Sequence, residues 1–398
     1  MAMGTRKGRE RQQTLWIANE EIVRPAGHPF YERLNQLLDS HQFDGWAEKL
    51  CQRFYQGPYG QPSLPPGAYF RLLLIGYFEG LESERAIAWR VADSLSLRKF
   101  LGYLLDETTP DHSTISRTRR LLWAETHDAM FTWVLKIVDE EGLLKGRSVG
   151  IDATTLEANA AMRTIVRREN GQGYEEFLRG LARNEGLENP TREELARFDR
   201  KRKNKASNED WTHPHDPDAR IAKMKDGSTH LAHKAEHAVD LSSGALLAVT
   251  VQPADEGDTE TLALTLQEAQ EAVREIRGGG IDEMTADKGY HSGEVLDQLY
   301  LQDVRSYLPE PDRGARCWED KSWEQRLVYA NRRRKCGAHG QQLLRKRGEL
   351  VERSFAHLYE TGAMRRLHLR GRENILKRLL VHAAAFNLSL VMRKRVAR

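Results

Sequence analysis

The chain has 398 residues, with 61 Lys and Arg against 58 Asp and Glu and a formal net charge of +3. This length predicts two or three domains with a substantial core, because a domain has roughly 100–200 residues. A content of 39% hydrophobic and 30% charged residues excludes a chain that is disordered throughout. The three scattered cysteines exclude a disulfide framework. We find neither an apolar signal segment nor an apolar run of about 18 residues, so we expect a reduced, soluble, cytoplasmic protein.

The first third of the chain is predicted to be helical. Residues 1–30 are polar and interrupted by glycine and proline, which predicts a flexible arm. From residue 31 to about 145, apolar residues recur at intervals of three and four, as on the buried face of a helix. We interpret residues 31–145 as one helical domain.

A segment near residue 111 has the features of a helix that binds in a DNA groove. It starts with Thr109-Pro110-Asp111 and carries hydroxyl and arginine side chains in its first turns. Small hydroxyls let a helix approach the DNA backbone closely, and arginines reach phosphates or guanine edges. An ordinary N-capped surface helix would have the same start, so both interpretations stay open at this point. The residues proposed for DNA binding are His112, Ser113, Thr114, Ser116, Arg117, Arg119 and Arg120.

After residue 145 the pattern changes to strands that alternate with helices. A strand at 147–155 precedes a charged insertion of about residues 160–228, and two strands joined by a tight turn follow at 230–240 and 245–253. A helix at 259–276, a strand, a helix and another strand complete the order, before a second insertion at about 309–340 and a last helix. Because the hairpin forces one antiparallel pair, the predicted fold class is α/β with a mixed sheet over residues 146–398.

Three acidic residues are candidates for one site in this α/β domain. Asp152 lies in the first predicted strand, where an unpaired carboxylate would be costly, and Asp287 ends a later strand, where side chains face a cleft. The last helix, 342–361, offers Glu349, Glu352 and Glu360. Its apolar stripe consists of Leu344, Val351, Phe355 and Leu358. At about 100° per residue, Glu352 lies roughly 90° from the centre of that stripe and Glu349 lies nearly opposite, so we select Glu352.

These carboxylates lie in three segments that carry a resemblance to a known family. Residues 150–154 (Gly-Ile-Asp-Ala-Thr), 285–290 (Thr-Ala-Asp-Lys-Gly-Tyr) and 347–356 (Arg-Gly-Glu-Leu-Val-Glu-Arg-Ser-Phe-Ala) resemble, in this order, the three acidic motifs of the bacterial insertion-sequence DDE transposases. Residues 111–117 and 369–374 resemble further motifs of the same group, the insertion-sequence four/five superfamily. The resemblance extends over about residues 30–395.

The resemblance implies an RNase H-like catalytic domain preceded by an all-helical DNA-binding domain. It implies a DNA transposase that binds the terminal inverted repeats of its insertion sequence and catalyses metal-dependent strand cleavage and strand transfer, which is cut-and-paste transposition. Asp152, Asp287 and Glu352 would be the catalytic residues and would hold two Mg²⁺ or Mn²⁺ ions, with Asp152 bridging both, since such hard cations favour carboxylate oxygens. The implied partners are double-stranded DNA, as terminal repeats and as target, and further copies of the chain at the bacterial nucleoid.

Two other functions stay open from the sequence. A decayed or domesticated relative would bind DNA without catalysis, and a metal-dependent nuclease would cleave DNA without joining it. The intact Asp152, Asp287 and Glu352 argue against the first of these. Only analysis of the reaction products separates the second.

Basic residues near the last helix are candidates for phosphate contacts. The family often has a lysine after the catalytic glutamate, but the matching position here holds Tyr359. Residues 331–347 contain seven Lys and Arg and no acid, and such a cluster beside the proposed site favours a role at the DNA backbone over a merely solvated face. The residues proposed for this role are Arg345, Arg347, Arg353 and Arg370.

Cys317, Cys336 and His339 form an incomplete zinc pattern. Their spacing matches no common zinc module, and a fourth ligand is unassigned. Zinc binding by the two cysteines is therefore left open.

Overall fold

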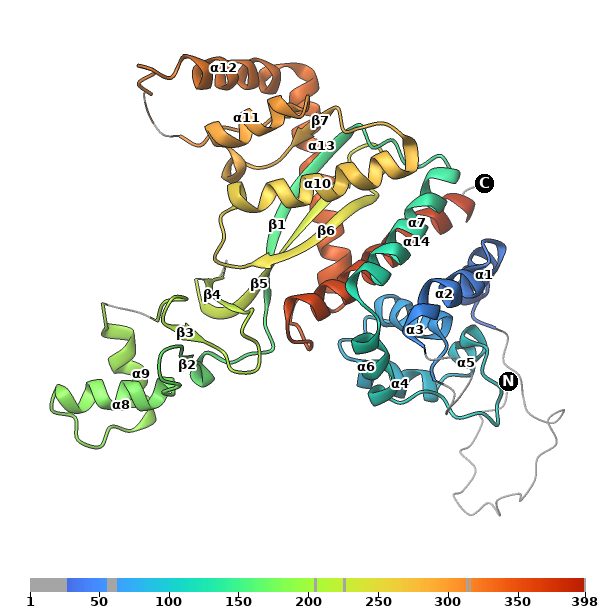
Figure 1. Ribbon diagram of the computed structural model, residues 1–398, viewed down its shortest axis with the longest axis horizontal. Helices are drawn as coiled ribbons and strands as arrows, with labels where there is room; N and C mark the ends of the chain where they lie inside the picture. Colours follow the sequence, from blue (N-terminus) through green and yellow to red (C-terminus); the bar gives the residue numbers. More distant parts are fainter. Residues whose placement is uncertain are drawn as a thin grey trace, which may run out of the picture.

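The computed structural model describes residues 27–55, 63–203, 206–224, 227–312, 314 and 316–396. A helical part, blue to teal in Figure 1, lies beside an α/β part built on a central sheet. Most of the predicted arm, residues 1–26, lies outside the described residues, and the end of that arm differs from the prediction because a helix begins at Pro29.

The N-terminal part is helical over most of its described length, which confirms the prediction from apolar spacing. Its elements are α1 (Pro29–Ser40), α2 (Phe43–Cys51), η1 (Gln52–Phe54), α3 (Pro66–Phe78), α4 (Glu84–Ala92), α5 (Leu95–Leu101), α6 (His112–Leu121) and α7 (Ala124–Glu140). Helix α3 is buried on all sides from Pro66 to Tyr77 and forms the centre of the bundle. Ser83, Ser94 and Asp111 begin α4, α5 and α6, because each side chain accepts an N–H three residues further on.

The larger sheet is mixed and has six strands among the described residues. They are β1 (Ser148–Glu157), β4 (Arg220–Lys223), β5 (Thr229–Asp240), β6 (Leu246–Pro253), β7 (Glu283–Thr285) and β8 (Arg305–Tyr307). The order is β4-β5-β1-β7-β8, and β6 also pairs with β5. Strand β5 is antiparallel to its neighbours, whereas β1, β7 and β8 are parallel. This is an RNase H-like sheet, and it confirms the predicted fold class.

Helices α10 (Asp258–Arg277) and α13 (Ala338–Phe355) cover opposite faces of the sheet (Figure 1). Glu236 and His237 follow one another in β5, so their side chains point to opposite faces. Glu236 accepts a hydrogen bond from Thr261 of α10, and the ring of His237 is hydrogen-bonded to Ser354 of α13. Strand β1 therefore runs through the middle of a three-layered arrangement.

Helix α14 (Arg372–Val396) connects the helical part with the sheet. It packs along α7 and also contacts α3 and β6, where the amide of Asn387 is hydrogen-bonded to the backbone of Leu246. One hydrophobic core consequently contains residues of both parts, such as Leu73 and Val149. The predicted boundary near residue 145 falls between α7 and β1, but the two parts are not separate hydrophobic units.

Among the described residues, one helix is long and apolar enough to cross a membrane, judged by length and composition alone. This helix is α14. The sequence predicted that every apolar run is too short to cross a membrane. The apolar segment of α14 is longer than predicted because it includes isolated charged residues. However, 83% of that window is buried inside the protein. Arg378 within it is buried and donates a hydrogen bond to the carbonyl of Leu81. These are the features of a core helix.

Both predicted insertions contain regular structure. The first holds η2 (Met162–Thr164), β2 (Val166–Arg167), α8 (Tyr174–Asn184), α9 (Arg192–Lys201) and β3 (Trp211–Thr212). It projects from the sheet in Figure 1 and has small hydrophobic clusters of its own, one of them around Trp211. The second contains α12 (Ser322–Cys336), which packs on α11 (Gly293–Leu301) and on α13.

Candidate active site

Asp152 and Asp287 occupy matching positions beyond a parallel strand pair. The last paired residues of β1 and β7 are Gly150 and Thr285, which lie opposite each other. Asp152 lies two residues beyond Gly150, and Asp287 lies two residues beyond Thr285. Since parallel strands present their carboxyl ends at one edge of a sheet, the register brings the two predicted carboxylates to the same edge.

The carboxylate of Asp152 is mostly buried, with 21% of its side chain exposed. One oxygen accepts the N–H of Ala153 at 2.9 Å, and the other lies 2.6 Å from a guanidinium nitrogen of Arg347. Burial raises the pKa of Asp152 to about 6; Arg347 opposes this shift, and the negative charges of Asp287 and Asp258 add to it. Crowded negative charge at a partly buried edge favours the binding of a further cation.

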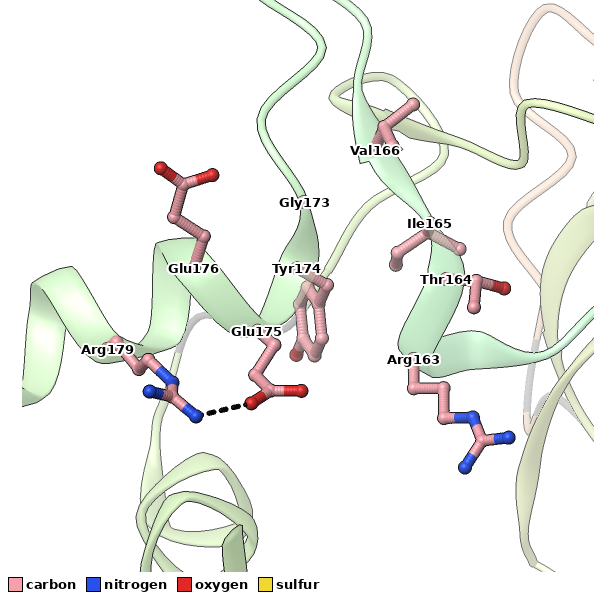
Figure 2. A pocket seen from close by; sticks show the side chains of 9 residues that line it. All are labelled: Arg163, Thr164, Ile165, Val166, Gly173, Tyr174, Glu175, Glu176 and Arg179. Atoms are coloured by element: carbon pink, nitrogen blue, oxygen red, sulfur yellow. Dashed lines mark hydrogen bonds and ion pairs between the residues drawn. The ribbon is translucent and has the colours of Figure 1, made fainter. Parts of the chain in front are cut away.

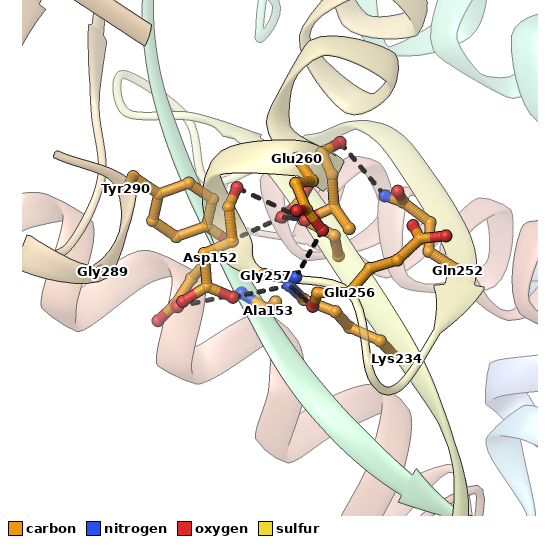
Figure 3. A network of polar contacts seen from close by, with 12 residues as sticks. Asp152, Ala153, Lys234, Gln252, Glu256, Gly257, Glu260, Gly289 and Tyr290 are labelled. Carbon is orange, nitrogen blue, oxygen red and sulfur yellow. Dashed lines mark hydrogen bonds and ion pairs between the residues drawn. The ribbon is translucent and has the colours of Figure 1, made fainter. Parts of the chain in front are cut away.

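Asp287 caps the short turn η3 (Lys288–Tyr290), where its Oδ1 accepts the N–H of Gly289 at 2.7 Å. Behind this turn, the hydroxyl of Tyr290 donates to Glu236 at 2.6 Å, and both side chains are fully buried. Figure 3 shows Tyr290 and Gly289 beside Asp152. The turn that carries Asp287 is thus fixed to β5.

A further carboxylate, Asp258, lies at this edge although the sequence analysis did not select it. Its Oδ2 is 2.6 Å from the position that a Cβ atom on Gly289 would take, and Oδ1 of Asp287 is 3.0 Å from the same position. Its other oxygen is 2.6 Å from Nζ of Lys234, a buried residue. In the sequence Asp258 has the pattern of an ordinary first-turn acid. Its place shortly after a sheet strand, five residues beyond the end of β6, was the one signal that pointed to the site.

Glu352 does not join this group in the structure. The buried face of α13 consists of Gly340, Leu343, Val351 and Ser354. Because Leu343 rather than Leu344 faces the sheet, Glu352 lies roughly 140° from the centre of that face at 100° per residue. It is exposed and has no hydrogen-bond or ion-pair partner among the described residues. The geometric argument for Glu352 was therefore wrong, while its catalytic role by resemblance stays a prediction.

The predicted set of three metal ligands is accordingly not assembled. Among the residues that the structure describes, no three His, Cys, Asp or Glu side chains lie in a group that could hold a metal ion. Asp152 and Asp287 have the right chemistry for Mg²⁺ or Mn²⁺, since both offer carboxylate oxygens. Glu352 has the right chemistry but the wrong position.

Sequence profiles of two transposase families match this chain. A transposase domain, DUF772, matches residues 19–121, and a transposase DDE domain matches residues 208–388. The chain belongs to the insertion-sequence DDE transposases. The second match includes Asp287 and Glu352, whereas Asp152 lies in the segment between the two matches. The family as a whole works with divalent metal and acts on DNA.

Three solved structures are similar to this transposase at a distant level. They are described as a Mos1 transposase paired-end complex with left transposon end, a pre-cleavage Mos1 transpososome, and a Mos1 mariner paired-end complex with Mn. Each has 11% sequence identity and a TM-score of 0.21, with 86%, 83% and 83% of this chain and 90%, 86% and 93% of the other chain covered. A likeness at this level does not transfer function. A search among curated proteins found no match.

The predicted DNA-binding helix of the transposase, α6, has an exposed side and a side that is used internally. Asp111 accepts hydrogen bonds from Thr114 N–H and Ser113, which lower its pKa to about 2. Arg117 folds back onto Ser113, while His112 and Arg120 are exposed. These two residues and Arg117 lie on the exposed side of the helix, and their DNA-binding role stays a prediction. Ser113 and Thr114 serve the cap of the helix.

The prediction that Arg119 binds DNA is wrong. Its side chain is buried, with Nε 2.7 Å from Glu84 of α4. The guanidinium also donates to Asn374 of α14 and to the hydroxyl of Ser116. Arg119 therefore connects α6 to α4 and α14, with Ser116 of the same helix accepting one of its N–H groups, and a guanidinium held in this way is not available to DNA.

The four basic residues predicted near the site have different surroundings. Arg347 reaches Asp152, as described above. Arg353 pairs with Glu349 at 2.7 Å on the outer side of α13, and Arg370 donates to the backbone carbonyl of Asn159 at 3.1 Å. Arg345 is exposed and has no ion-pair partner among the described residues.

Cys317, Cys336 and His339 do not form a zinc site among the described residues. Cys317 and Cys336 are exposed free thiols, and the His339 ring is 3.0 Å from the carboxylate of Glu283. Glu283 also accepts from Ser148. His339 thus belongs to a polar contact between α13 and the sheet.

A cavity of about 390 Å³ in the first insertion is distinct from the carboxylate edge (Figure 2). Residues of η2, β2 and α8 line it, and the ion pair between Glu175 and Arg179, 2.7 Å long, spans one turn of α8. The cavity contains none of the predicted site residues. The candidate active site lies instead at the partly buried sheet edge that carries Asp152 and Asp287.

Proposed function

We propose that this transposase binds the terminal inverted repeats of its insertion sequence and moves the element by metal-dependent strand cleavage and strand transfer, the cut-and-paste route. The observation that carries the proposal is the convergence of Asp152 and Asp287 beyond the paired ends of β1 and β7, in a chain of the DDE family. Two carboxylates at one sheet edge suit phosphodiester chemistry, in which the transition state is strongly anionic.

The donor set fits Mg²⁺ or Mn²⁺ in kind, and two ions would be held chiefly by Asp152 and Asp287. When bound, two such ions supply Lewis-acid activation of the attacking oxygen and charge neutralisation at the scissile phosphate. Glu352 is the third ligand that the resemblance implies, but its exposed position on α13 does not place it at this edge.

Arg347 is the residue best placed to bind the phosphate backbone at the site. Its Nη2 already contacts Asp152, and its Nε is buried without a hydrogen-bond partner. An arginine fork offers donors in two directions, so Nη2 can orient the carboxylate while Nη1, rather than the buried Nε, binds a phosphate oxygen. Arg345, exposed on the same helix, extends this basic surface.

The helical part is proposed to bind the terminal repeats through the exposed side of α6. Arg120 and His112 lie there, and Arg117 needs only to leave Ser113 to reach DNA. Synapsis of two element ends calls for at least two copies of the chain, so we propose an oligomer on DNA. The proposed place of action is the cytoplasm, at the nucleoid of a bacterial cell.

Excision and reinsertion of a marked element test the proposal. The element carries its native flanking DNA, and the protein is supplied in trans as wild type, Asp287→Asn or the matched control Asp282→Asn. Asp282 is exposed and lies before β7, away from the site. We expect movement with wild type and control and none with Asp287→Asn, because the amide loses the charge that holds metal. Equal activity of all three would refute the site.

One observation favours a second candidate, a DNA-binding relative without catalysis. The three predicted ligands are not assembled, because Glu352 faces outward. Such a protein would bind the terminal repeats in a mobility-shift assay but would yield no excised element. Cleaved ends without joined products would instead identify a nuclease.

A further inference from the structure

We propose that residues 15–23 of this chain bind in an apolar groove between α1 and α14 of the same copy. The groove is distinct from the carboxylate edge and from the cavity in the first insertion. It consists of two adjoining hollows, of about 500 and 400 Å³, which share Arg33, Met392 and Val396. The proposal concerns a contact within one chain and depends on neither metal nor DNA.

The larger hollow is lined by segments that lie far apart in the sequence. Helices α1 and α3 of the helical part form one side, and α14 and the π-helix η4 (Ala356–Thr361), which continues α13, form the other. Its apolar lining residues are Phe30, Tyr77, Phe78, Met392 and Val396. A segment bound in this groove therefore contacts the helical part and the end of α13 together.

The apolar lining of the groove is partly open to solvent. Val396 is 62% exposed. Phe30 and Phe78 are only partly buried, although their ring centroids lie 4.6 Å apart. Apolar and aromatic side chains that gather at a concave, solvent-facing surface mark a place where another apolar segment binds. The groove therefore favours an occupant with large apolar side chains.

Two cations beside this lining favour an occupant that also carries negative charge. Arg33 of α1 and Arg393 of α14 are exposed at the larger hollow. Neither forms an ion pair among the described residues, although Arg393 donates to the backbone and the hydroxyl of Ser389 on its own helix. By contrast, Arg395 at the smaller hollow pairs with Glu141 at 2.7 Å. The groove thus fits an apolar segment that contains acidic residues.

Residues 15–23 have this composition. Their sequence is Leu-Trp-Ile-Ala-Asn-Glu-Glu-Ile-Val, in which two acids stand between two apolar groups. A tryptophan has about 150–250 Å² of surface to bury, so Trp16 gains most from an apolar groove. Residues 1–14 contain four Lys and Arg and one acid, and their charge does not suit a groove with two free cations. The DUF772 match begins at residue 19, so the second half of the segment belongs to the matched domain.

The point at which the described chain begins favours the groove of the same copy. Gly27 is the first described residue, and the ring centroid of His28 lies 6.4 Å from that of Phe30 in the groove. Val23 is four residues before Gly27, which allows a separation of roughly 14 Å at most. Pro25 and Gly27 suit a change of chain direction between the segment and α1.

Photo-cross-linking of the full-length protein tests the proposal. A benzophenone amino acid replaces Trp16, and mass spectrometry identifies the peptide to which it becomes attached. We expect attachment to α1, α14 or η4 of the same chain. The matched control carries the benzophenone in place of Gln12, in the basic residues before the segment, and is expected to give no such attachment. Attachment elsewhere or to a second copy, no attachment, or equal attachment from both positions would overturn the proposal.

Charge reversal tests the contacts between the acids and the arginines. Arg33→Glu combined with Arg393→Glu is expected to lower the cross-link yield from position 16 by about threefold or more, as the loss of two exposed ion pairs would do. Adding Glu20→Arg and Glu21→Arg to the same protein is expected to restore the yield. Arg85→Glu, exposed on α4 and outside the groove, is the matched control. A yield that reversal leaves unchanged, that Arg85→Glu lowers equally, or that is not restored would overturn the proposal.

Discussion

The guanidinium of Arg347 lies 2.6 Å from the carboxylate of Asp152, although 195 residues separate them in the chain. Gly150 makes this contact possible, because a Cβ atom there would lie 3.2 Å from both Arg347 Cγ and Val351 Cγ2. Helix α13 can therefore pack closely on β1, and the arginine stem passes over Gly150 to reach Asp152. In the absence of metal, an arginine holds the central acid of the site.

Metal binding is expected to strengthen as the pH rises through about 6. Burial raises the pKa of Asp152 from 3.8 to about 6, and only the ionised carboxylate is a good ligand for Mn²⁺. Mn²⁺ titrations between about pH 5 and pH 8 measure this step, which is expected to be absent from Asp152→Asn. Between pH 3.8 and about pH 6, Asp152 is protonated in the folded protein but ionised in the unfolded chain. The contribution of Asp152 to the free energy of unfolding therefore decreases as the pH rises through this range.

Replacing Arg347 by methionine is expected to move that pH midpoint upward. The positive charge of Arg347 lowers the pKa of Asp152, and methionine keeps part of the stem without the charge. Arg345→Met is the matched control, since Arg345 lies on the same helix but is exposed. A midpoint that moves equally in both variants, or in neither, contradicts the role of the ion pair.

Gly289→Ala is expected to reduce Mn²⁺ binding and DNA cleavage while the fold is kept. The new methyl group would lie 2.6 Å from Asp258 Oδ2 and 3.0 Å from Asp287 Oδ1, so at least one carboxylate must move. Gly279→Ala is the control, because a Cβ atom at Gly279 meets nothing within 4 Å. Wild-type Mn²⁺ affinity in Gly289→Ala would show that the space between the carboxylates is not used.

Arg119→Met is expected to lower the free energy of unfolding by about 3–5 kcal/mol, because it leaves Glu84 without its partner in a largely buried pair. Urea unfolding followed by circular dichroism measures the change. Arg120→Met, one residue away and exposed, is expected to leave stability unaltered. Equal stability of both variants would mean that the contact of α6 with α4 and α14 contributes little.

The placement of Asp152 and Asp287 at one edge of the sheet could be predicted from the sequence, because it depends on strand order alone, while their catalytic role stays a prediction. Asp152 lies in a strand that reads clearly as β and Asp287 follows another, and the parallel pairing of these strands puts both residues beyond Gly150 and Thr285. The mixed sheet was likewise readable, since the turn between β5 and β6 forces an antiparallel pair. These features are local or follow from neighbouring elements.

Glu352, Asp258 and Arg119 depend on packing, which the sequence does not show. Choosing Leu344 instead of Leu343 as the inward residue turned the predicted face of α13 and with it the direction of Glu352. Asp258 approaches the site only because α10 packs on the turn η3. Arg119 is buried by α14, which begins more than 250 residues later.

Arg120→Ala is expected to weaken binding of the terminal repeat without changing the fold or the Mn²⁺ affinity. Arg120 is exposed at the end of α6 and has no ion-pair partner among the described residues, so its charge is free to neutralise a phosphate. Loss of one phosphate contact reduces the slope of log K against log salt by about 0.9. Fluorescence anisotropy over a series of salt concentrations measures both affinity and slope.

Arg183→Ala, in the first insertion, is the control for a general loss of positive charge. An equal change of slope in the two variants would remove α6 from the DNA-binding surface, whereas a change confined to Arg120→Ala would place a phosphate beside the exposed end of that helix.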